Sequence, residues 1–567
     1  MEKNAQPPRA RSGWGRGIGV AMGLSLLTGA SALWAAPNAG ASPPPLVKGQ
    51  RAPYVDNFNP FSPVSLDGYN WNQDYFYQTL FWWGGTRHSP LPVVHPYLAT
   101  GYKWLPGNTS VVVTLRKGVK WADERPFTSQ DVVFTFDLLK KYPQFDSNGD
   151  WSVLQSVKAQ GPLQVEFTFK YVDVPFFYFI AGKTPIIPAH IWAHVANPVT
   201  FQNLHPVGTG PMELKSFSRV EVVLQANPHY WGGKVGVPEF IFPDVTSVSQ
   251  QYLEADQGVI DWTGGAFKNV RQVYTGKNPH FHFWKGPLVL NFTSLYTNDA
   301  RYPLNSVLFR QGLYYAINRA QVGKLSGYNA APANPFNVPN PSTYLSPQQI
   351  AQYRYAYDPG KARAIFARLG FKEVHGHLLA PNGKAVSLPI ITTPGVPWWV
   401  AEAEVISAQL KQVGISAPVE TEPGSTFTSQ QTLGQFWLAI NGNADMYPGP
   451  WLTNDPLYTA YAPVGQTAAL DFERYHNARL TGLFEAYGRT ANPATQRKLM
   501  GQISILVAQQ LPILPIVGQD GKGGIVGGMY STLHYVGWPG ATNPYALAGN
   551  WNWPQNEVIV ARLKPAR

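Results

Sequence analysis

The pattern of apolar and polar residues is clearest between Val111 and Leu139, where it predicts a strand followed by a helix. Apolar side chains alternate along Val111–Leu115 with the period of two that a β-strand requires. Lys117-Gly118 provides a turn, and Thr128 stands three residues before Asp131, the spacing of a capping box with Asp in place of the usual Glu. Apolar residues then recur at helical spacing, at Val132, Val133, Phe136 and Leu139. A strand, a polar loop and a capped helix are therefore expected here.

A second alternating segment runs from Gly208 to Gly233, with the sequence GTGPMELKSFSRVEVVLQANPHYWGG. Val220, Val222 and Leu224 alternate with Glu221, Val223 and Gln225, and Asn227-Pro228 ends this predicted strand. The glycines at the start of the segment permit a sharp entry. A phosphate-binding loop is excluded, because no Gly-Lys-Ser/Thr sequence is present and no helix pattern begins after the glycines.

Helices and strands continue to alternate toward the C-terminus. The pattern predicts helices over residues 250–257, 357–371 and 398–413, and strands over residues 259–262, 288–291, 388–391, 415–417 and 511–516. Asp358 stands at an N-cap position with Pro359 at the first helical position, and Gly370 closes that helix. The strand, helix and strand between residues 388 and 417 form the unit from which α/β lobes are built.

The N-terminus has the pattern of a secretory signal peptide. Residues 1–32 contain three arginines and a lysine, then the apolar run Gly17–Leu27, and then the cleavage-site sequence Ala30-Ser31-Ala32. An uncleaved anchor is the alternative, but the apolar run is too short to span a bilayer comfortably. Residues 33–50 are rich in Pro, Ala and Gly and are expected to form a disordered linker. We therefore expect an exported protein whose mature part is soluble.

Composition narrows the class of protein. A chain of 567 residues with 44% hydrophobic content exceeds one ordinary core, so two or three domains are expected. Cysteine is absent, which excludes disulfides, zinc–thiolate sites, a cysteine nucleophile and lipid attachment through cysteine. The formal charge is +11, and residues 1–32 contribute +3 of it (four basic residues against one acidic), which leaves +8. Without a run of five basic residues, this charge indicates a solvated basic surface rather than a nucleic-acid site.

The segment Val111–Leu139 resembles a signature of the extracytoplasmic solute-binding proteins of ABC importers, in the oligopeptide/dipeptide/nickel-binding family (family 5, cluster C type). Further matches occur in the family's order at residues 59–63, 186–192, 208–233, 309–325, 357–371, 388–417 and 511–516. The chain departs from the family pattern at several positions, among them Gly312, which stands where the family has Ala. Asp123-Glu124 replaces an Asp-Gly, so the turn there is expected to differ, and Asn318 stands where the family has Asp.

The resemblance implies an α/β fold with two hinged lobes, the type II periplasmic-binding-protein fold with the extra subdomain of the peptide-binding group, and a ligand cleft between the lobes. On this basis the first lobe is expected over residues 51–287, with an inserted subdomain over about residues 69–207. The second lobe is expected over residues 288–512, and residues 513–567 are expected to return to the first lobe. No bond is broken in such a protein, so no catalytic residues are expected.

The resemblance also implies a site. Asp445 occupies the position of a carboxylate that receives a peptide's α-amino group in the family, by a charge-assisted hydrogen bond. Its neighbours Asn441 and Asn443 are candidate ligand residues, although family members that bind peptides often have Gly-Trp at this point. A solvated loop or a helix cap remains the alternative role of Asp445. The sequence Gly449-Pro450-Trp451 is similar to that of family members that bind oligosaccharides.

Aromatic residues supply the other candidates. Tryptophan faces stack on sugars or line side-chain pockets, whereas core packing is the default role of any single tryptophan. Of the 19 tryptophans, Trp398 and Trp451 are the strongest candidates because each adjoins a loop that contains proline. The remaining aromatic candidates are Trp437, Tyr69 and Trp71.

The function expected from these patterns is capture of extracytoplasmic peptides and their delivery to the permease subunits of an ABC importer, by a monomer without a cofactor. An oligosaccharide ligand is the alternative within this class, and a secreted hydrolase is the alternative outside it, although no G-x-S-x-G or H-E-x-x-H motif is present. His190 and His194 have a metal-chelating spacing, but no carboxylate lies close to them in the sequence, so no metal site is expected. The protein is expected in the periplasm or at the outer face of the cytoplasmic membrane.

Overall fold

The computed structural model describes residues 43–49, 54–62, 75–86, 89–245, 248–266, 270–285, 293–325, 331–338, 340–394, 396–442, 451, 462–466, 468, 471–518, 526–538 and 555–566. The predicted leader, most of the predicted linker and the predicted crossing strand at 288–291 lie outside these residues. Within the described ranges, every helix is too short or too polar to span a bilayer.

One set of sheets combines the N-terminal half of the chain with its C-terminal end. Its strands are β1 (Leu46–Val47), β2 (Phe81–Thr86), β3 (Ser89–Pro96), β4 (Ala99–Trp104), β5 (Ser110–Leu115), β6 (Leu154–Gly161), β7 (Gln164–Phe169), β8 (Met212–Phe217), β9 (Glu221–Ala226), β10 (Glu239–Pro243), β11 (Trp262–Ala266), β12 (Phe281–Lys285), β21 (Val526–Ser531), β22 (Tyr535–Val536) and β23 (Lys564–Pro565). They form sheets of the order β1-β10-β9-β8, β4-β5-β7-β6 and β11-β21-β12, and the pairs β2-β3 and β22-β23.

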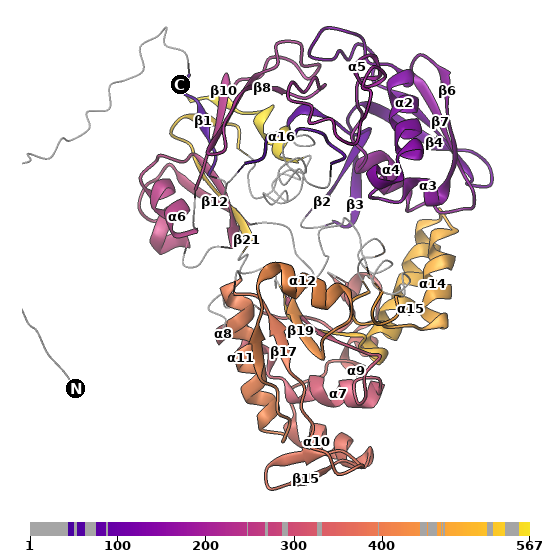
Figure 1. The fold of residues 1–567 in the computed structure, drawn as a ribbon, viewed down its shortest axis with the longest axis vertical. Coiled ribbons are helices and arrows are strands. Elements are labelled where there is room, and N and C mark those ends of the chain that lie inside the picture. The colour runs from indigo at the N-terminus through magenta and orange to yellow at the C-terminus, as the bar shows by residue number, and fades with distance from the viewer. Residues whose placement is uncertain are drawn as a thin grey trace, which may run out of the picture. The chain divides into compact units, whose positions relative to one another are not determined.

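The helices between these strands are short, apart from one. They are α2 (Ser129–Lys141), η2 (Pro143–Phe145), α3 (Asp150–Val153), α4 (Phe177–Gly182), α5 (Ala189–Trp192), α6 (Val248–Asp256), η3 (Arg271–Thr275) and α16 (Gln555–Val560). We call the described residues 43–285 and 526–566 the first lobe (Figure 1).

The remaining residues form a second lobe, residues 293–518, around one large sheet. Its strands are β13 (Thr293–Thr297), β14 (Ala331–Pro332), β17 (Ile390–Thr392), β18 (Val419–Thr421), β19 (Leu438–Asn441) and β20 (Ile513–Gly518), and β15 (Lys372–Val374) and β16 (His377–Leu379) form a separate hairpin. The order of the large sheet is β14-β20-β13-β19-β17-β18. Its helices are α7 (Val307–Ala316), α8 (Arg319–Leu325), η4 (Pro341–Thr343), α9 (Pro347–Gln352), α10 (Pro359–Arg368), α11 (Pro397–Lys411), α12 (Gly424–Thr432), α14 (Ala478–Gly488) and α15 (Pro493–Gln510).

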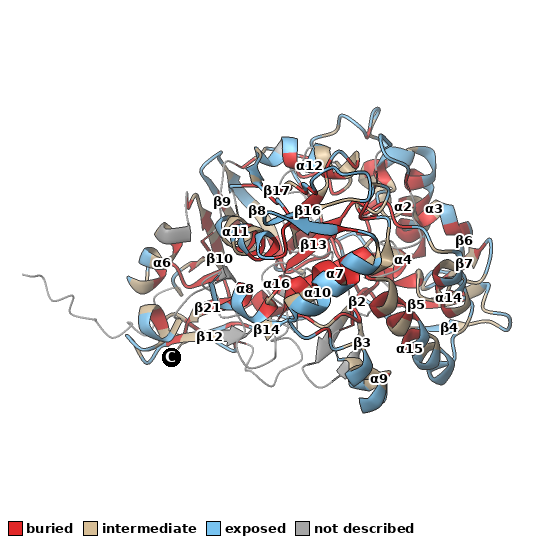
Figure 2. Ribbon diagram, turned by 90° about the horizontal axis from the view of Figure 1, so that it is seen from below, coloured by how far each residue is buried: buried red, intermediate tan, exposed pale blue. Residues whose placement is uncertain are grey.

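Each lobe has its own hydrophobic core. The core of the first lobe joins buried residues between Leu46 and Trp262 to others between Tyr535 and Leu563, and the main core of the second joins residues between Leu295 and Val517. Buried residues lie along the sheets and on the inward faces of the helices (Figure 2). The protein therefore has the two-lobed α/β fold that the sequence predicts.

The return to the first lobe begins later than expected. Residues 513–518 were predicted to belong to the first lobe, but β20 pairs with β13 and β14 inside the large sheet of the second lobe. The apolar run from Ile513 is buried along its whole length, which suits an internal strand of that sheet. The next described strand that pairs with strands of the first lobe is β21, which begins at Val526.

Two of the sequence motifs are joined by hydrogen bonds within the first lobe. The capping box forms as predicted: the Thr128 side chain accepts from the Gln130 N–H, and the Asp131 carboxylate accepts from the Thr128 N–H at 2.8 Å. The other oxygen of Asp131 accepts from the Ala189 N–H at 3.0 Å, which ties the helix to a second motif. Burial raises the pKa of Asp131, against the lowering effect of these backbone N–H groups. These residues therefore have a structural role.

The glycines of the Gly-Thr-Gly-Pro motif permit close packing of two backbones. A Cβ atom on Gly208 would lie 1.9 Å from the carbonyl oxygen of Phe76, and one on Gly210 would lie 2.2 Å from that of Tyr75. The Gly210 N–H donates to the Phe76 carbonyl at 2.9 Å, and the Asn227 side chain donates to the Gly210 carbonyl at 2.7 Å. A side chain at either glycine is therefore incompatible with this contact.

The turn at Asp123-Glu124 keeps a shape that favours glycine. Glu124 has φ = 67°, in the left-handed region, and its N–H donates to the Trp121 carbonyl at 2.9 Å. The family's glycine would adopt this conformation without steric cost. The sequence predicted a turn that differs in detail, and the difference is local strain at a non-glycine residue.

The family match over residues 309–325 falls on two helices. Helix α7 ends before Ile317, which is extended, and α8 begins at Arg319. The Asn318 side chain accepts from the Gln321 N–H at 3.1 Å, as an N-cap does. Asn318 is the residue that replaces the family's Asp, and both side chains can accept this hydrogen bond.

Candidate ligand-binding site

One edge of the large sheet collects polar residues from three strands. Strands β17 and β19 are parallel, so their carboxyl ends, at Thr392 and Asn441, lie at the same edge. Strand β13 runs antiparallel to β19, which brings its amino end, at Thr293 and Ser294, to that edge as well. We call this edge the carboxyl edge of the second lobe. In open α/β sheets ligands bind outside the carboxyl ends of the strands.

On the face covered by α12, Ser294 and Asn441 are directly opposed partners of the β13–β19 ladder. The Asn441 amide donates to the Gln431 side-chain carbonyl of α12 at 2.7 Å. Ser294 and Gln431 are buried, and among the described residues neither the Ser294 hydroxyl nor the Gln431 amide nitrogen has a hydrogen-bond partner. Buried polar groups without partners are rare in native proteins, so this arrangement calls for an explanation.

The opposite face, covered by α11, carries a buried carboxyl group. Glu402 is 0% exposed, and among the described residues its carboxyl oxygens have no hydrogen bond of good geometry, with the Thr293 hydroxyl as their polar neighbour. Burial raises the pKa of Glu402 to about 8, against the smaller opposing effect of the neighbouring Thr293 hydroxyl. Thr293 and Thr392 on this face are also buried with unpartnered hydroxyls. Burial of Glu402 therefore favours its neutral, protonated form at pH 7.

The sequence did not single out Ser294, Gln431 or Glu402. Glu402 precedes Ile406 by four residues and so falls on the apolar face of its helix, where a carboxylate is out of place. That mismatch was the available signal. Ser294 lies in a strand whose residues are all buried, and its partner in the ladder cannot be deduced from sequence alone.

Four of the predicted site residues lie outside the described residues: Asp445, Asn443, Tyr69 and Trp71. Of the others, Asn441 and Trp398 lie at the carboxyl edge. Trp398 is in the first turn of α11, which follows β17, and it is partly exposed. Its ring makes an edge contact with Trp399, with centroids 6.5 Å apart.

The other two tryptophans lie elsewhere. Trp437 immediately precedes β19, at the opposite end of that strand from Asn441, and the Arg301 guanidinium lies 5.1 Å from its ring centroid. Trp451 is 5% exposed in a hydrophobic cluster. Its ring stacks on Tyr487 at 6.0 Å, and its N–H donates to the Phe484 carbonyl at 3.4 Å. These contacts match core packing, the alternative role that the sequence left open.

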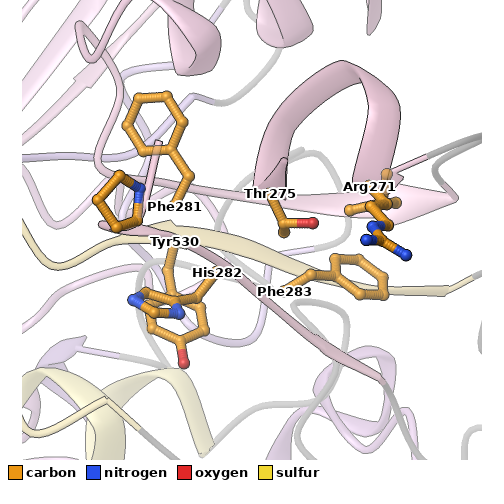
Figure 3. A pocket seen from close by; sticks show the side chains of 8 residues that line it. Arg271, Thr275, Phe281, His282, Phe283 and Tyr530 are labelled. Atoms are coloured by element: carbon orange, nitrogen blue, oxygen red, sulfur yellow. The ribbon is translucent and has the colours of Figure 1, made fainter. Parts of the chain in front are cut away.

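A surface pocket of about 580 Å³ lies in the first lobe beside strand β12. It is lined by residues of the short helix η3 and by aromatic side chains of β12 and β21 (Figure 3). His282 stacks on Tyr530 with ring centroids 5.3 Å apart, and Arg271 lies exposed at the pocket. All residues that line this pocket belong to the first lobe.

The histidines do not form a metal site with other described residues. Nε2 of His190 lies 2.7 Å from the Asp123 carboxylate, which assigns it a structural partner. Across the described ranges, no three or more His, Cys, Asp or Glu side chains gather where they could hold a metal ion.

Comparison with known proteins assigns the chain to a family. The model of "Bacterial extracellular solute-binding proteins, family 5 Middle" matches residues 93–463, more than half of the chain. The chain is 26% identical over 346 residues to the oligopeptide-binding protein AppA of Bacillus subtilis, an alignment that covers 59% of this chain and 62% of AppA. It is 25% identical over 387 residues to the dipeptide-binding protein of Escherichia coli K12, covering 62% and 69% of the two chains.

Solved structures share the fold. A periplasmic oligopeptide-binding protein of Thermotoga maritima has a TM-score of 0.81 at 24% identity, covering 92% of this chain and 99% of its own. The same Thermotoga protein with bound mannohexaose has a TM-score of 0.76 at 25% identity, covering 92% and 98%. AppA of Bacillus subtilis with a bound nonapeptide has a TM-score of 0.70 at 19% identity, covering 93% and 100%. Sequence motifs, two-lobed fold and family model agree: the chain belongs to family 5 of the bacterial extracellular solute-binding proteins.

Proposed function

We propose that this protein is the substrate-binding component of an ABC import system and that it captures extracytoplasmic peptides for the membrane permease. The observation that carries the proposal is the family match over residues 93–463, joined to a carboxyl edge that presents polar side chains where α/β sheets bind ligands. The named relatives bind oligopeptides and dipeptides, which favours a peptide ligand.

The mechanism is ligand-dependent closure of the two lobes. A ligand that contacts both lobes stabilises the closed form by its differential affinity for that form, and the permease recognises the result. Asp445, which follows Asn441 by four residues, is the proposed acceptor of the peptide's α-amino group. Trp398, at the same edge as Asn441, is positioned to cover an apolar or planar part of the ligand.

An oligosaccharide is the second candidate ligand. The Thermotoga neighbour is an oligopeptide-binding protein by name and yet holds mannohexaose. The edge residues Asn441 and Gln431 are uncharged amides, which suit sugar hydroxyls as well as peptide groups. In either case the protein works outside the cytoplasm, as a monomer without catalytic residues, and the secretory leader over residues 1–32 directs it there.

A thermal-shift panel tests the proposal. The mature protein is mixed with di- to nonapeptides and with manno-, cello- and xylo-oligosaccharides. A ligand present at a hundred times its Kd adds about 2.7 kcal/mol to the folded state, which raises Tm by a few degrees. A peptide that stabilises the wild type but not Asp445→Ala supports both the function and the site.

The matched control is Glu420→Ala, which removes an exposed carboxylate of the same lobe. This variant should bind like the wild type. A sugar response that Asp445→Ala leaves unchanged favours the oligosaccharide alternative. Hydrolysis of any panel member, with no stabilisation by an intact one, contradicts the proposal and favours a secreted hydrolase.

A further inference from the structure

The face of the carboxyl edge that α12 covers brings three uncharged polar side chains together. Ser294 and Asn441 are opposed across the β13–β19 ladder, where paired Cβ atoms lie about 5 Å apart on the same face. Gln431 reaches Asn441 from α12 through the 2.7 Å amide–amide hydrogen bond. We call Ser294, Gln431 and Asn441 the amide–hydroxyl cluster.

The side chains of the cluster have more hydrogen-bond donors and acceptors than they use among themselves. Two carboxamides that share one hydrogen bond use one N–H and one carbonyl lone pair, and they retain further donors and acceptors whichever way each amide is turned. Here the Gln431 amide nitrogen and the Ser294 hydroxyl are buried without partners in the described part of the chain. Each such group costs about 1–3 kcal/mol when it stays unsatisfied. The cluster therefore favours a bound group that both donates and accepts hydrogen bonds.

The surroundings make a charged partner unsuitable. The three elements that carry the cluster, β13, β19 and α12, contain no Asp, Glu, Lys, Arg or His. Phe427 of α12 packs with Ile391 and Ala439 in a hydrophobic cluster on the same face. A charge held only by amides and one hydroxyl beside such a cluster would lose its hydration without a counter-ion.

We propose that the amide–hydroxyl cluster recognises an uncharged group of the ligand that carries both a donor and an acceptor, namely a hydroxyl or a carboxamide. The inference rests on the proposed solute-binding function and specifies the chemistry that the second lobe selects. A sugar hydroxyl and a peptide amide share this chemistry. The cluster thus accounts for selection of uncharged ligand groups, whereas Asp445 is the proposed acceptor of a charged one.

The test compares two neighbouring residues on opposite faces of β13. Ser294→Ala removes the unpartnered hydroxyl of the cluster, and Thr293→Val removes an unpartnered hydroxyl from the face covered by α11. Neither change should lower the Tm of the ligand-free protein, because each deletes a buried polar group that has no partner. Affinity for mannohexaose and for a nonapeptide is then measured by titration calorimetry on the mature wild type and on both variants.

Ser294→Ala should weaken binding about 2- to 10-fold, the worth of one neutral hydrogen bond, and Thr293→Val should bind like the wild type. Gln431→Met, which removes the amide at nearly constant length, provides a second variant with the same expected loss. A loss for mannohexaose alone identifies a hydroxyl as the bound group, and a loss for the nonapeptide alone identifies a carboxamide.

Equal affinity of the wild type, Ser294→Ala and Gln431→Met for every ligand that binds would overturn the inference and leave the proposed function intact. A crystal structure of a complex in which an ordered water satisfies the cluster and no ligand atom touches it would overturn it too. If the wild type binds no member of the wider peptide and sugar panel, the proposed function fails and the inference fails with it.

Discussion

Replacing Glu402 by glutamine should stabilise the ligand-free protein, and increasingly so as the pH rises. The carboxyl group is 0% exposed and has no hydrogen bond of good geometry among the described residues, and burial raises its pKa from 4.5 to about 8. The folded protein therefore keeps the proton between these two pH values, whereas the unfolded chain releases it. Because the unfolded state binds fewer protons, the free energy of unfolding falls as the pH rises through this window.

The size of this stability difference follows from the interval between the ordinary pKa of Glu402, 4.5, and its raised pKa of about 8. One proton corresponds to about 1.4 kcal/mol per pH unit, so the wild type loses about 3 kcal/mol between pH 4.5 and pH 7 through this group alone. Glutamine has nearly the same shape and does not titrate. Near pH 4.5 the two proteins should be about equally stable, and at pH 7 the variant should be more stable by about 3 kcal/mol.

Urea unfolding followed by tryptophan fluorescence at pH 5, 6 and 7 measures this difference. Other buried carboxyls with raised pKa values, such as Asp150 and Asp299, contribute equally to both proteins and cancel. The control is Glu404→Gln, which lies two residues away on the same helix and is exposed, and whose pH profile should run parallel to that of the wild type. A parallel profile for Glu402→Gln would refute the reasoning, since it would mean that Glu402 is ionised in the folded state.

Three further substitutions test the local structure by urea unfolding of the mature protein. Glu124→Gly should raise the free energy of unfolding by up to about 1 kcal/mol, because glycine adopts φ = 67° without strain; a clear loss would contradict the strained turn. Gly208→Ala should lower it by more than about 2 kcal/mol, because the new Cβ would meet the Phe76 carbonyl oxygen at 1.9 Å, and a neutral result would refute the close contact. Asp358→Ala should lower it by about 1 kcal/mol, because the Lys361 N–H loses its cap at 2.8 Å, and Asp358→Asn should retain most of the stability.

The fold was predictable because its motifs are local. The capping box at Thr128 and the Asp358 cap each depend on residues within three positions, and both form as predicted. The division of α7 from α8 is hard to read from the sequence because the apolar pattern continues across Ile317, and only the side-chain cap at Asn318 marks the break. The return strand was assigned to the wrong lobe because a wholly apolar run shows that a strand is buried but does not show in which sheet.

The site was less predictable, because its chemistry depends on pairing between distant segments. Trp398 and Trp451 both adjoin proline-containing loops and look alike in the sequence, yet one lies partly exposed at the sheet edge and the other is stacked on Tyr487. Ser294 is a candidate site residue because it lies opposite Asn441 in the β13–β19 ladder. Strand register is a tertiary property, and alternation within one strand does not reveal it.

The unpartnered groups at the carboxyl edge link stability to binding. Ser294, Gln431 and Glu402 lower the stability of the free protein, since each is buried with an unsatisfied polar atom. They come from three separate elements that meet at one edge of one sheet. A ligand that forms hydrogen bonds with such atoms in the closed form stabilises that form and not the open one. This is the differential interaction that a closure mechanism needs. Ser294→Ala, which deletes such an atom from the amide–hydroxyl cluster, should therefore show equal or higher stability without ligand and a smaller gain in stability when ligand is added.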